Sequence, residues 1–442
     1  MIKSLITCTM SLVLLCCVTQ RTLSQNSTLT NEVNTSEIDS VRYMDQVNSI
    51  AELDIMQEAF EYIESTDDQT VETQIHLNEI PAPPFMEEQR AARYAELMQE
   101  YGLEDVTIDN EGNVIGKRAG QVGDKTIVIS AHLDTVFPEG TDVRVTVKND
   151  TLYAPGISDD ARGLTTVLTI LRTLNEKDIK TNDNIWFVGT VGEEGLGDLR
   201  GVKHLFRDGH EIDAFISIDG SNSTRIVNKA LGSHRYKVTY NGPGGHSWGA
   251  FGIANPAHAL GHAVSEFDKR ASSFIETAPR TSYNVGRISG GTSVNSVPFE
   301  NWMEIDMRSV SVQSLNEIDA ILKDAIEHGL NQANDTKNHG EDLTVQTEMI
   351  GERPSGEIDE REPFIQRAIA ATKYFGDDHQ LVRSSTDSNV PISLGIPSMT
   401  LGGGGDSSGS HSLDEWWLNK NGHEAIQRAL LILISEAEIY QN

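Results

Sequence analysis

The stretch NDNIWFVGTVGEEGLGD, residues 182–198, joins an apolar run directly to a pair of acidic residues. The run from Ile185 to Val191 predicts a buried strand, and Glu193 and Glu194 come after it between two glycines. Acidic residues and glycines are also common in solvated turns at strand ends. The choice between a turn and a functional site therefore depends on which residues come after the other apolar runs of the chain.

Apolar and β-branched runs alternate with amphipathic segments in both terminal parts of the chain. Strands are predicted at 106–118, 126–136, 184–191 and 214–220, and helices at 47–65, 83–103, 363–376 and 422–440. The run 164–174 is β-branched as well, but it follows a turn that contains two aspartates and also fits a helix. Strands that alternate with helices predict an α/β layer structure.

The segment 233–351 has a different order of elements. It reads strand, helix, strand, strand, helix, strand, which is the ferredoxin-like βαββαβ pattern. We therefore expect a small domain at 233–351 that is inserted in a larger one. The two parts of the larger domain then cover 45–232 and 352–442, and a polar linker precedes them at 25–44.

The N-terminus has the pattern of an export signal. Lys3 precedes an apolar core that is short for a membrane span, and residues 1–24 are predicted as a cleaved signal peptide. A buried N-terminal helix is one alternative, and a lipid anchor at Cys16 or Cys17 is another. We expect an exported protein that is periplasmic or secreted.

Composition limits the chemistry and the partners of the mature chain. All three cysteines lie inside the predicted signal, so a metal site must be built from histidine, aspartate and glutamate. The formal net charge of −31 disfavours binding to nucleic acid or to an anionic membrane. The expected partner is therefore a small molecule, and the only membrane contact that we consider is the alternative lipid anchor.

Further polar clusters lie after the predicted strands of the larger domain. His132 and Asp134 follow one apolar run, and Asp219 follows another. Asp159 and Asp160 lie in a glycine-containing turn before a predicted helix. Aspartate is a common helix N-cap, so one of these two could cap the helix while the other binds a ligand.

His411 completes the set, in a loop rich in glycine and serine that we expect to line the pocket. Alone, each cluster fits an ordinary turn, a helix cap or a hydrogen-bonded histidine. Together they place two histidines and several carboxylates at strand ends, where open α/β sheets bind their ligands. Because zinc is bound by histidine and carboxylate side chains, the sequence predicts a metal site.

Five motifs resemble, in the same order, those of the aminoacylase, peptidase T and glutamate carboxypeptidase family of co-catalytic zinc hydrolases, metallopeptidase family twenty. They are SAHLDTV, GISDDARG, GEEGLGD, SIDGS and HSLDEWW, and the resemblance covers roughly residues 50–442. It implies a phosphorylase/hydrolase-like zinc-peptidase domain. The inserted ferredoxin-like domain would then be a lid and dimerisation domain.

This resemblance implies a set of five metal ligands. Two zinc ions, for which cobalt or manganese could substitute, would be bridged by Asp159. His132 and Asp219 would complete the ligands of one ion, and Glu194 and His411 those of the other.

The resemblance also assigns catalytic roles. Asp134 would orient His132, and Glu193 would be the general base that takes a proton from water. Two adjacent glutamates would otherwise repel each other and raise one pKa, and bound cations remove this conflict.

Substrate binding is assigned by the resemblance to His246, Asn295 and Arg308 of the inserted domain. They would bind a substrate carboxylate or polarise the scissile carbonyl, with His246 reaching into the neighbouring subunit. Ordinary turn residues and a surface cation are the alternatives. We expect a homodimer formed through this domain, because open sheet edges are usually covered or paired. A monomer in which the domain is only a lid is the alternative.

The predicted activity is metal-dependent hydrolysis of amide bonds in small peptides, of the aminopeptidase type. Aspartate rather than glutamate at position 219 favours this side of the resemblance. An N-acyl-amino-acid deacylase or a carboxypeptidase is the alternative within the family. A non-catalytic peptide-binding protein is the alternative from another class.

Overall fold

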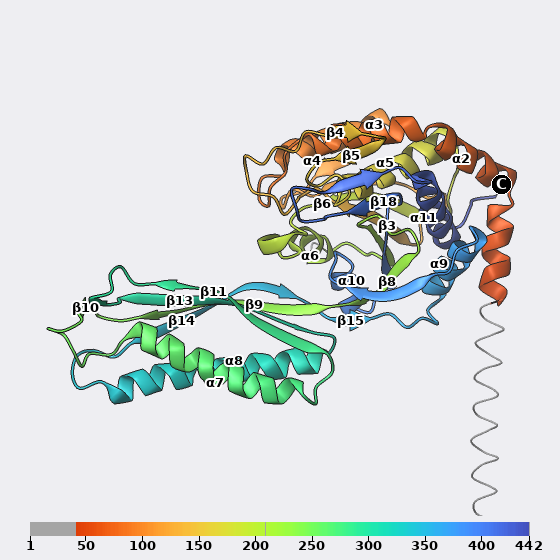
Figure 1. Ribbon diagram of the computed structural model, residues 1–442. Helices are drawn as coiled ribbons and strands as arrows, with labels where there is room; N and C mark the ends of the chain where they lie inside the picture. The colour runs from red at the N-terminus through yellow and green to blue at the C-terminus, as the bar shows by residue number, and fades with distance from the viewer. Residues whose placement is uncertain (1–40, 208, 442) are drawn as a thin grey trace, which may run out of the picture.

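The computed structural model describes residues 41–207 and 209–441. The predicted signal peptide and most of the predicted linker lie outside the described residues. Figure 1 shows a rounded larger domain from which a long, narrow inserted domain extends, and the two are called the catalytic domain and the lid, the names that the resemblance implies. Within the described ranges, no helix has the length and hydropathy needed to span a membrane. The predicted α/β class is confirmed.

A nine-stranded sheet forms the centre of the catalytic domain, in the order β1-β2-β6-β3-β7-β17-β8-β15, with β16 paired to β8. The strands β6, β3, β7 and β17 pair in parallel, and they are mostly buried on both faces. The bounds are β1 (Asp105–Ile108), β2 (Val114–Arg118), β3 (Thr126–His132), β6 (Asn184–Thr190), β7 (Ala214–Ile218), β8 (Arg225–Ala230), β15 (Gly356–Glu357), β16 (Gln380–Ser384) and β17 (Ser398–Leu401).

Helices cover both faces of this sheet. The larger core packs one face against α2 (Asp54–Ser65), α4 (Glu88–Glu100), α5 (Ala161–Glu176), α9 (Pro363–Tyr374) and α11 (Gly422–Ala437), and α3 (Asp67–Asn78) packs on α5. A smaller core lies on the other face, under α6 (Arg200–Arg207) and α10 (Asn389–Ser393).

The structure decides one segment for which strand and helix were both open, and it corrects one predicted helix. The β-branched run 164–174 is helical, within α5, because the connection between the parallel strands β3 and β6 requires a crossover element and Asp160 caps its start. The helix predicted at 47–65 is interrupted at 52–53. Residues 41–51 form a helix of their own, so the last residues of the predicted linker are helical.

A small four-stranded sheet joins segments that are far apart in the sequence. Its order is β18-β19-β5-β4, with β4 (Thr146–Lys148), β5 (Thr151–Tyr153), β18 (Asp406–Ser408) and β19 (Trp416–Leu418). Trp417 is fully buried in it. The pairing of β19 with β5 brings the C-terminal loop beside the turn that precedes α5.

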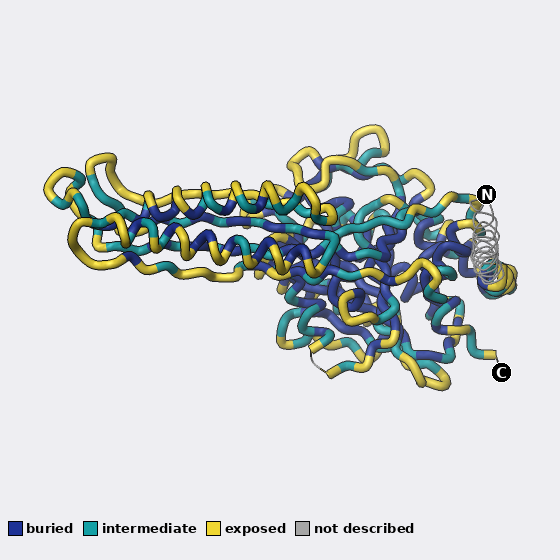
Figure 2. Tube along the Cα trace, turned by 90° about the horizontal axis from the view of Figure 1, so that it is seen from below, coloured by how far each residue is buried: buried dark blue, intermediate teal, exposed yellow. Residues whose placement is uncertain are grey.

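The lid domain has the strand order β11-β13-β9-β14, with every neighbouring pair antiparallel. Its two helices cover one face and enclose a separate apolar core, and their outer surfaces are exposed in Figure 2. The elements are β9 (Gly232–Asn241), α7 (Pro256–Ile275), β11 (Thr281–Gly290), β13 (Glu300–Ser309), α8 (Val312–Thr336) and β14 (Thr344–Arg353), and the short strands β10 (Gly245–His246) and β12 (Ser296–Val297) form its tip.

The lid meets the catalytic domain through polar contacts near the end of β6. Arg235 of β9 donates from Nη1 to the main-chain oxygen of Gly195, at 2.8 Å. Both carboxylate oxygens of Asp198 accept from the main-chain nitrogen of Glu352, at 2.9 Å. These contacts place one end of the lid sheet beside the motif that contains the two glutamates.

Candidate active site

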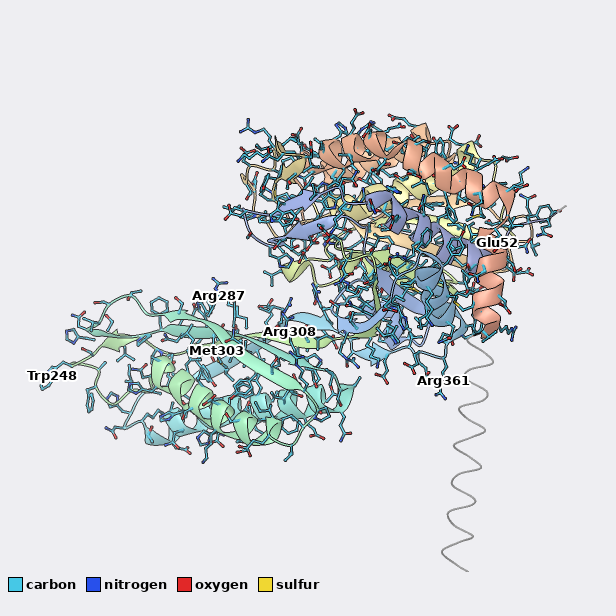
Figure 3. All side chains as sticks on the ribbon, turned by 45° about the vertical axis from the view of Figure 1, so that its right-hand side comes forward. Glu52, Trp248, Arg287, Met303, Arg308 and Arg361 are labelled. Carbon is cyan, nitrogen blue, oxygen red and sulfur yellow. The ribbon has the colours of Figure 1, made fainter. Side chains whose placement is uncertain are left out.

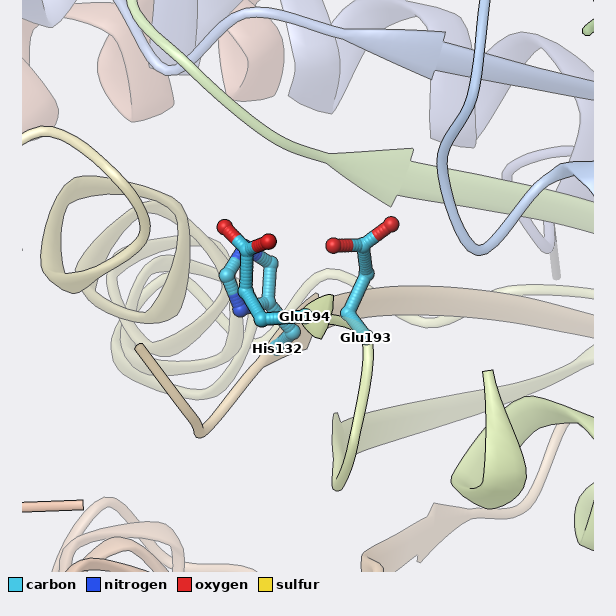
Figure 4. Close-up of side chains that lie close together, drawn as sticks. All are labelled: His132, Glu193 and Glu194. Carbon is cyan, nitrogen blue, oxygen red and sulfur yellow. The ribbon is translucent and has the colours of Figure 1, made fainter. Parts of the chain in front are cut away.

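The site lies where three neighbouring parallel strands end. His132 is the last residue of β3, Glu193 and Glu194 come after β6, and Asp219 comes after β7. Parallel strands have their carboxyl ends at one edge of the sheet, so one fold brings these side chains together. Figure 4 shows His132 and Glu194 side by side, with Glu193 next to them.

Asp159 lies at the centre of the cluster, between two histidines. Its Oδ1 is 3.0 Å from Nε2 of His132, and its Oδ2 is 3.2 Å from Nε2 of His411. Nε2 of His411 is also 2.9 Å from Oε1 of Glu194. The two oxygens of one carboxylate therefore face two different histidines, which is the geometry of a bridging ligand.

Two groups of potential metal ligands share Asp159. One is His132, Asp159 and Asp219, and the other is Asp159, Glu194 and His411. Within each group the candidate ligand atoms lie within 4.8 Å of one another. Histidine nitrogen and carboxylate oxygen suit zinc and similar divalent ions, and the residues present therefore fit a pair of metal ions.

Electrostatics in the protein alone also favours cations at this position. Burial raises the pKa of Asp219 to about 6, and the nearby Asp159 adds to the rise. Hydrogen bonds with Asp159 and Glu194 raise the pKa of His411 to about 10. Closely spaced buried carboxylates attract either protons or metal ions, because isolated buried charges are costly.

The two aspartates before α5 differ in their contacts, as the sequence suggested: one caps the helix and the other faces the potential metal ligands. Asp160 is buried and caps the helix, accepting from the main-chain nitrogen of Gly163 at 3.1 Å. It also accepts from the main-chain nitrogen of His132, at 3.1 Å. Asp159 points into the metal-ligand cluster, and the peptide bond between the two aspartates is cis.

Asp134 has a broader part than the one we expected. Nδ1 of His132 is 3.0 Å from the main-chain oxygen of Asp134 and 3.5 Å from its carboxylate. The carboxylate oxygens accept the main-chain N–H groups of Glu193 and Glu194, at 3.0 and 2.8 Å. Asp134 thus fixes the histidine ring mainly through its backbone, and its side chain holds the two glutamates in place.

Glu193 faces an arginine that sequence reasoning missed. Arg353, the last residue of β14, donates from Nη1 to Oε1 of Glu193 at 3.1 Å and to Oγ of Ser385 at 3.0 Å. Its Nη2 contacts the main-chain oxygen of Glu193. Burial raises the pKa of Glu193 well above its ordinary value, and Arg353 opposes this rise. The sequence held no signal for Arg353, which ends an ordinary lid strand.

A second missed residue, Glu415, supports the turn that carries Asp159. Its fully buried carboxylate accepts from the main-chain nitrogens of Gly156, Ser158 and Asp159, at 2.8, 2.8 and 3.1 Å. It also accepts from Oγ of Ser158, at 2.7 Å. The motif HSLDEWW contained this residue, but its partners become neighbours only when β19 pairs with β5.

The three predicted substrate-binding residues of the lid lie in different places. Arg308 lines a cavity of about 480 Å³ together with the glutamates, Asp159, Asp219, Ser410 and His411. His246 and Asn295 are exposed on β10 and the loop before β12, at the tip of the lid. Figure 3 shows Trp248 at that tip, far from Arg308. Within one chain, the fold does not bring His246 and Asn295 to the metal-ligand cluster.

Comparison with known proteins identifies the class of this site. The model of Peptidase family M20/M25/M40 matches residues 128–434. The chain is 26% identical over 311 residues to the uncharacterized protein YqjE of Bacillus subtilis, covering 67% of this chain and 78% of that protein.

Solved structures have the same fold. Aminopeptidase PepT of Bacillus cereus matches with a TM-score of 0.65 and 21% identity, over 84% of this chain and 99% of that chain. YXEP of Bacillus subtilis, described as a dinuclear metal binding peptidase from the M20 family, matches with a TM-score of 0.63 and 15% identity, over 85% of this chain and all of that chain (100%).

The chain belongs to Peptidase family M20/M25/M40, and the resemblance seen in the five motifs is confirmed. It is a metal-dependent peptidase or amidohydrolase of this family.

Proposed function

We propose that this protein is an exported dizinc exopeptidase that hydrolyses the amide bonds of small peptides, with Glu193 as its general base. One observation carries the proposal. The two carboxylate oxygens of Asp159 face two separate groups of ligands, and an additional carboxylate, that of Glu193, lies beside them without belonging to either Asp159 group.

The two ligand groups that share Asp159 support a role for each of their residues toward the metal ions. His132 and Asp219 would hold one ion, Glu194 and His411 the other, and Asp159 both. Ions bound there would polarise the scissile carbonyl and acidify water. Zinc is preferred over magnesium or calcium because two of the five side chains are histidines.

Glu193 moves the proton in this mechanism. Its carboxylate takes a proton from the attacking water and delivers it to the leaving amine, a role that general bases fill at heavy-atom distances of hydrogen-bond length. Arg353 holds Oε1 of Glu193 and favours its ionised form. Asp134 holds the backbone of Glu193, so that the carboxylate keeps its direction.

The lid supplies the groups that position the substrate. The guanidinium of Arg308 faces the same cavity as Glu193 and suits the carboxylate at the end of a short peptide. His246 and Asn295 would act on a second copy of the chain, within a homodimer that is formed through the lid. Their exposure and their distance from the cluster in one chain support a role across an interface.

Export is proposed from the sequence alone. The apolar stretch after Lys3 and the placement of every cysteine within residues 1–24 support a cleaved signal and a periplasmic or secreted mature protein. Mass spectrometry of the mature N-terminus tests this proposal and would also reveal a lipid on Cys16 or Cys17.

Metal removal and a subsequent substrate panel test the activity. We expect a chelator to abolish hydrolysis, and zinc or cobalt to restore it. Dipeptides and tripeptides with a free amino group should be cleaved faster than N-acetyl amino acids. Faster cleavage of the N-acetyl compounds would make the protein a deacylase. Full activity in excess chelator would contradict the metal-dependent mechanism itself, and binding without turnover would favour a non-catalytic peptide-binding protein.

A further inference from the structure

Four arginines line the cavity of the candidate active site, in a chain that has 35 basic and 66 acidic residues. Arg235, Arg308 and Arg353 come from the strands of the lid, and Arg225 comes from the catalytic domain. Such a concentration of positive charge is unusual for a protein of net charge −31. What these cations can bind depends on which of them the protein already neutralises.

The three lid arginines each have a carboxylate partner. Nε of Arg235 and Nε of Arg308 donate to the two oxygens of Asp306, at 2.9 and 2.8 Å. Arg353 pairs with Glu193 at 3.1 Å. Two arginines that share one aspartate leave the lid wall of the cavity with one net positive charge.

Arg225 differs from the other three. Its Nη2 donates to the main-chain oxygen of Asp219 at 2.7 Å, and its buried Nε has no hydrogen-bond partner. Among the described residues, Arg225 forms no ion pair with a carboxylate. It therefore places in the cavity a second positive charge that no carboxylate of the described residues contacts at ion-pair distance, and this charge comes from the catalytic domain rather than from the lid.

The topology of the sheet explains why Arg225 lies at this edge. Strand β8 runs antiparallel to β17, and Ile226 pairs with Leu401, the last residue of β17. The first residue of β8 therefore lies where β7 and β17 end, beside Asp219. No strand-end motif marks it in the sequence, because the functional edge coincides with the beginning of this strand.

We propose that Arg225 forms a second anion subsite, and that the substrates of this enzyme carry two carboxylates, one for Arg308 and one for Arg225. The inference rests on the proposed function, which assigns the carboxylate of the leaving amino acid to Arg308. The second carboxylate then belongs to the acyl part of the substrate. It is either the side chain of an N-terminal acidic residue or the free end of a dicarboxylic acyl group.

Matched substrate pairs distinguish charge from shape. The zinc-loaded enzyme is assayed with L-Glu-L-Ala against L-Gln-L-Ala, and with N-succinyl-L-alanine against its terminal amide. We expect kcat/KM to be at least about tenfold higher for the acid than for the amide in the pair that the enzyme uses, as for a hydrogen bond to a charged group. The pair that is cleaved identifies the source of the carboxylate.

The variant Arg225→Gln should remove this preference, and Arg225→Lys should keep part of it. Arg144→Gln, at an arginine whose side chain is 81% exposed, is the matched control and should keep it fully. An equal loss for acid and amide in Arg225→Gln would mean that Arg225 only supports Asp219, and would overturn the proposal. A parent enzyme with no preference for the acid would overturn it as well.

Binding separates this inference from the proposed reaction. Calorimetric titration of the zinc-loaded Glu193→Gln variant with the same four compounds measures the preference without turnover. Tighter binding of the acids that is lost when Arg225→Gln is added supports the subsite. This holds even if the parent enzyme cleaves none of the four compounds, because the absence of cleavage would contradict only the proposed function. Equal binding of acids and amides would overturn the subsite.

Discussion

The catalytic domain and the lid contribute to the site in different ways. His132, Glu193 and Glu194 are buried, and hydrogen bonds with Asp134 of the same domain hold all three, while Arg353 at the end of the lid strand β14 also holds Glu193. His246 and Asn295 are exposed at the far end of the lid. The metal-ligand cluster therefore forms within one chain, whereas the lid tip, under the proposed function, would act on a second copy of the chain.

The largest effect is expected from Glu193→Gln. The glutamine amide could not accept the proton of the attacking water, so kcat should fall by about 10²–10⁴-fold, the usual contribution of a general base. The content of bound metal should stay unchanged, because Glu193 belongs to neither group that contains Asp159. Steady-state kinetics and metal analysis of the same sample measure both quantities.

Glu104→Gln, at an exposed glutamate of the catalytic domain, is the control for this change. Its kcat and metal content should equal those of the parent. His132, Glu193 and Glu194 also lie close enough together to form a group of potential metal ligands. A Glu193→Gln protein that has lost metal would therefore show that Glu193 is a ligand. A fully active one would contradict the assignment of the base.

A smaller effect is expected from Glu415→Gln. The amide would present an N–H group to donors that now meet a carboxylate, and the turn that carries Asp159 would loosen. Loss of such a supporting hydrogen-bond partner typically weakens metal binding by about 10–100-fold. Dialysis against graded chelator measures the change, and Asp414→Asn, at the exposed neighbouring residue, should leave the affinity unchanged. An unchanged affinity in Glu415→Gln would limit Glu415 to a role in folding.

The sequence could predict the part of the site that lies on neighbouring parallel strands. His132, Glu193 and Asp219 each come at or after the end of an apolar run, and the rule that such runs end at one edge is enough to bring them together. It could not predict Glu415 or Arg225. Their places depend on the pairing of β19 with β5 and of β8 with β17, between segments far apart in the sequence.

The fold shows the same division between local and long-range information. Alternating strands and helices indicated the α/β class and the βαββαβ order of the lid. The composition of the run 164–174 fitted both a strand and a helix, because the intrinsic conformational preference of residues is weak. The need for a connection that crosses between the parallel strands β3 and β6 decides for the helix. In the proposed homodimer, His246 and Asn295 would reach an active site only across the interface, and the pattern of strands and helices in one chain does not predict that interface.

Mixing two inactive variants tests that relation. If His246 acts across a dimer interface, Glu193→Gln and His246→Ala subunits should form hybrids with one working site. Random exchange of equal amounts would then restore about a quarter of the parent activity, because half of the dimers are hybrids with one of two sites intact. Native mass spectrometry of differently labelled subunits verifies the exchange. No recovery after verified exchange would place His246 in its own chain, and a monomer by light scattering would end the dimer proposal.

The smallest effect concerns the stability of the lid alone. Asp319 on α8 is 3.3 Å from Nδ1 of His234 on β9 and 2.6 Å from Nζ of Lys323. Burial raises the pKa of Asp319, but hydrogen bonds with His234 and Lys323 outweigh it and hold the pKa well below its usual value. Asp319→Asn should therefore lower the free energy of unfolding of the lid by about 1 kcal/mol at pH 7.

This contribution has a defined pH dependence. A carboxyl group whose pKa is lower in the folded state than in the unfolded state stabilises the fold at pH values above its unfolded-state pKa of about 4. This stabilisation is lost as the pH falls toward the folded-state pKa. The difference between parent and Asp319→Asn should therefore shrink below about pH 4. Hydrogen exchange of the amides of α8 measures this difference in stability locally, and Asp324→Asn, whose side chain is 66% exposed on the same helix, should change the stability little.

Because the lid has its own apolar core, Asp319→Asn should leave the metal affinity of the catalytic domain intact, and a loss of metal would show that the two domains unfold as one unit.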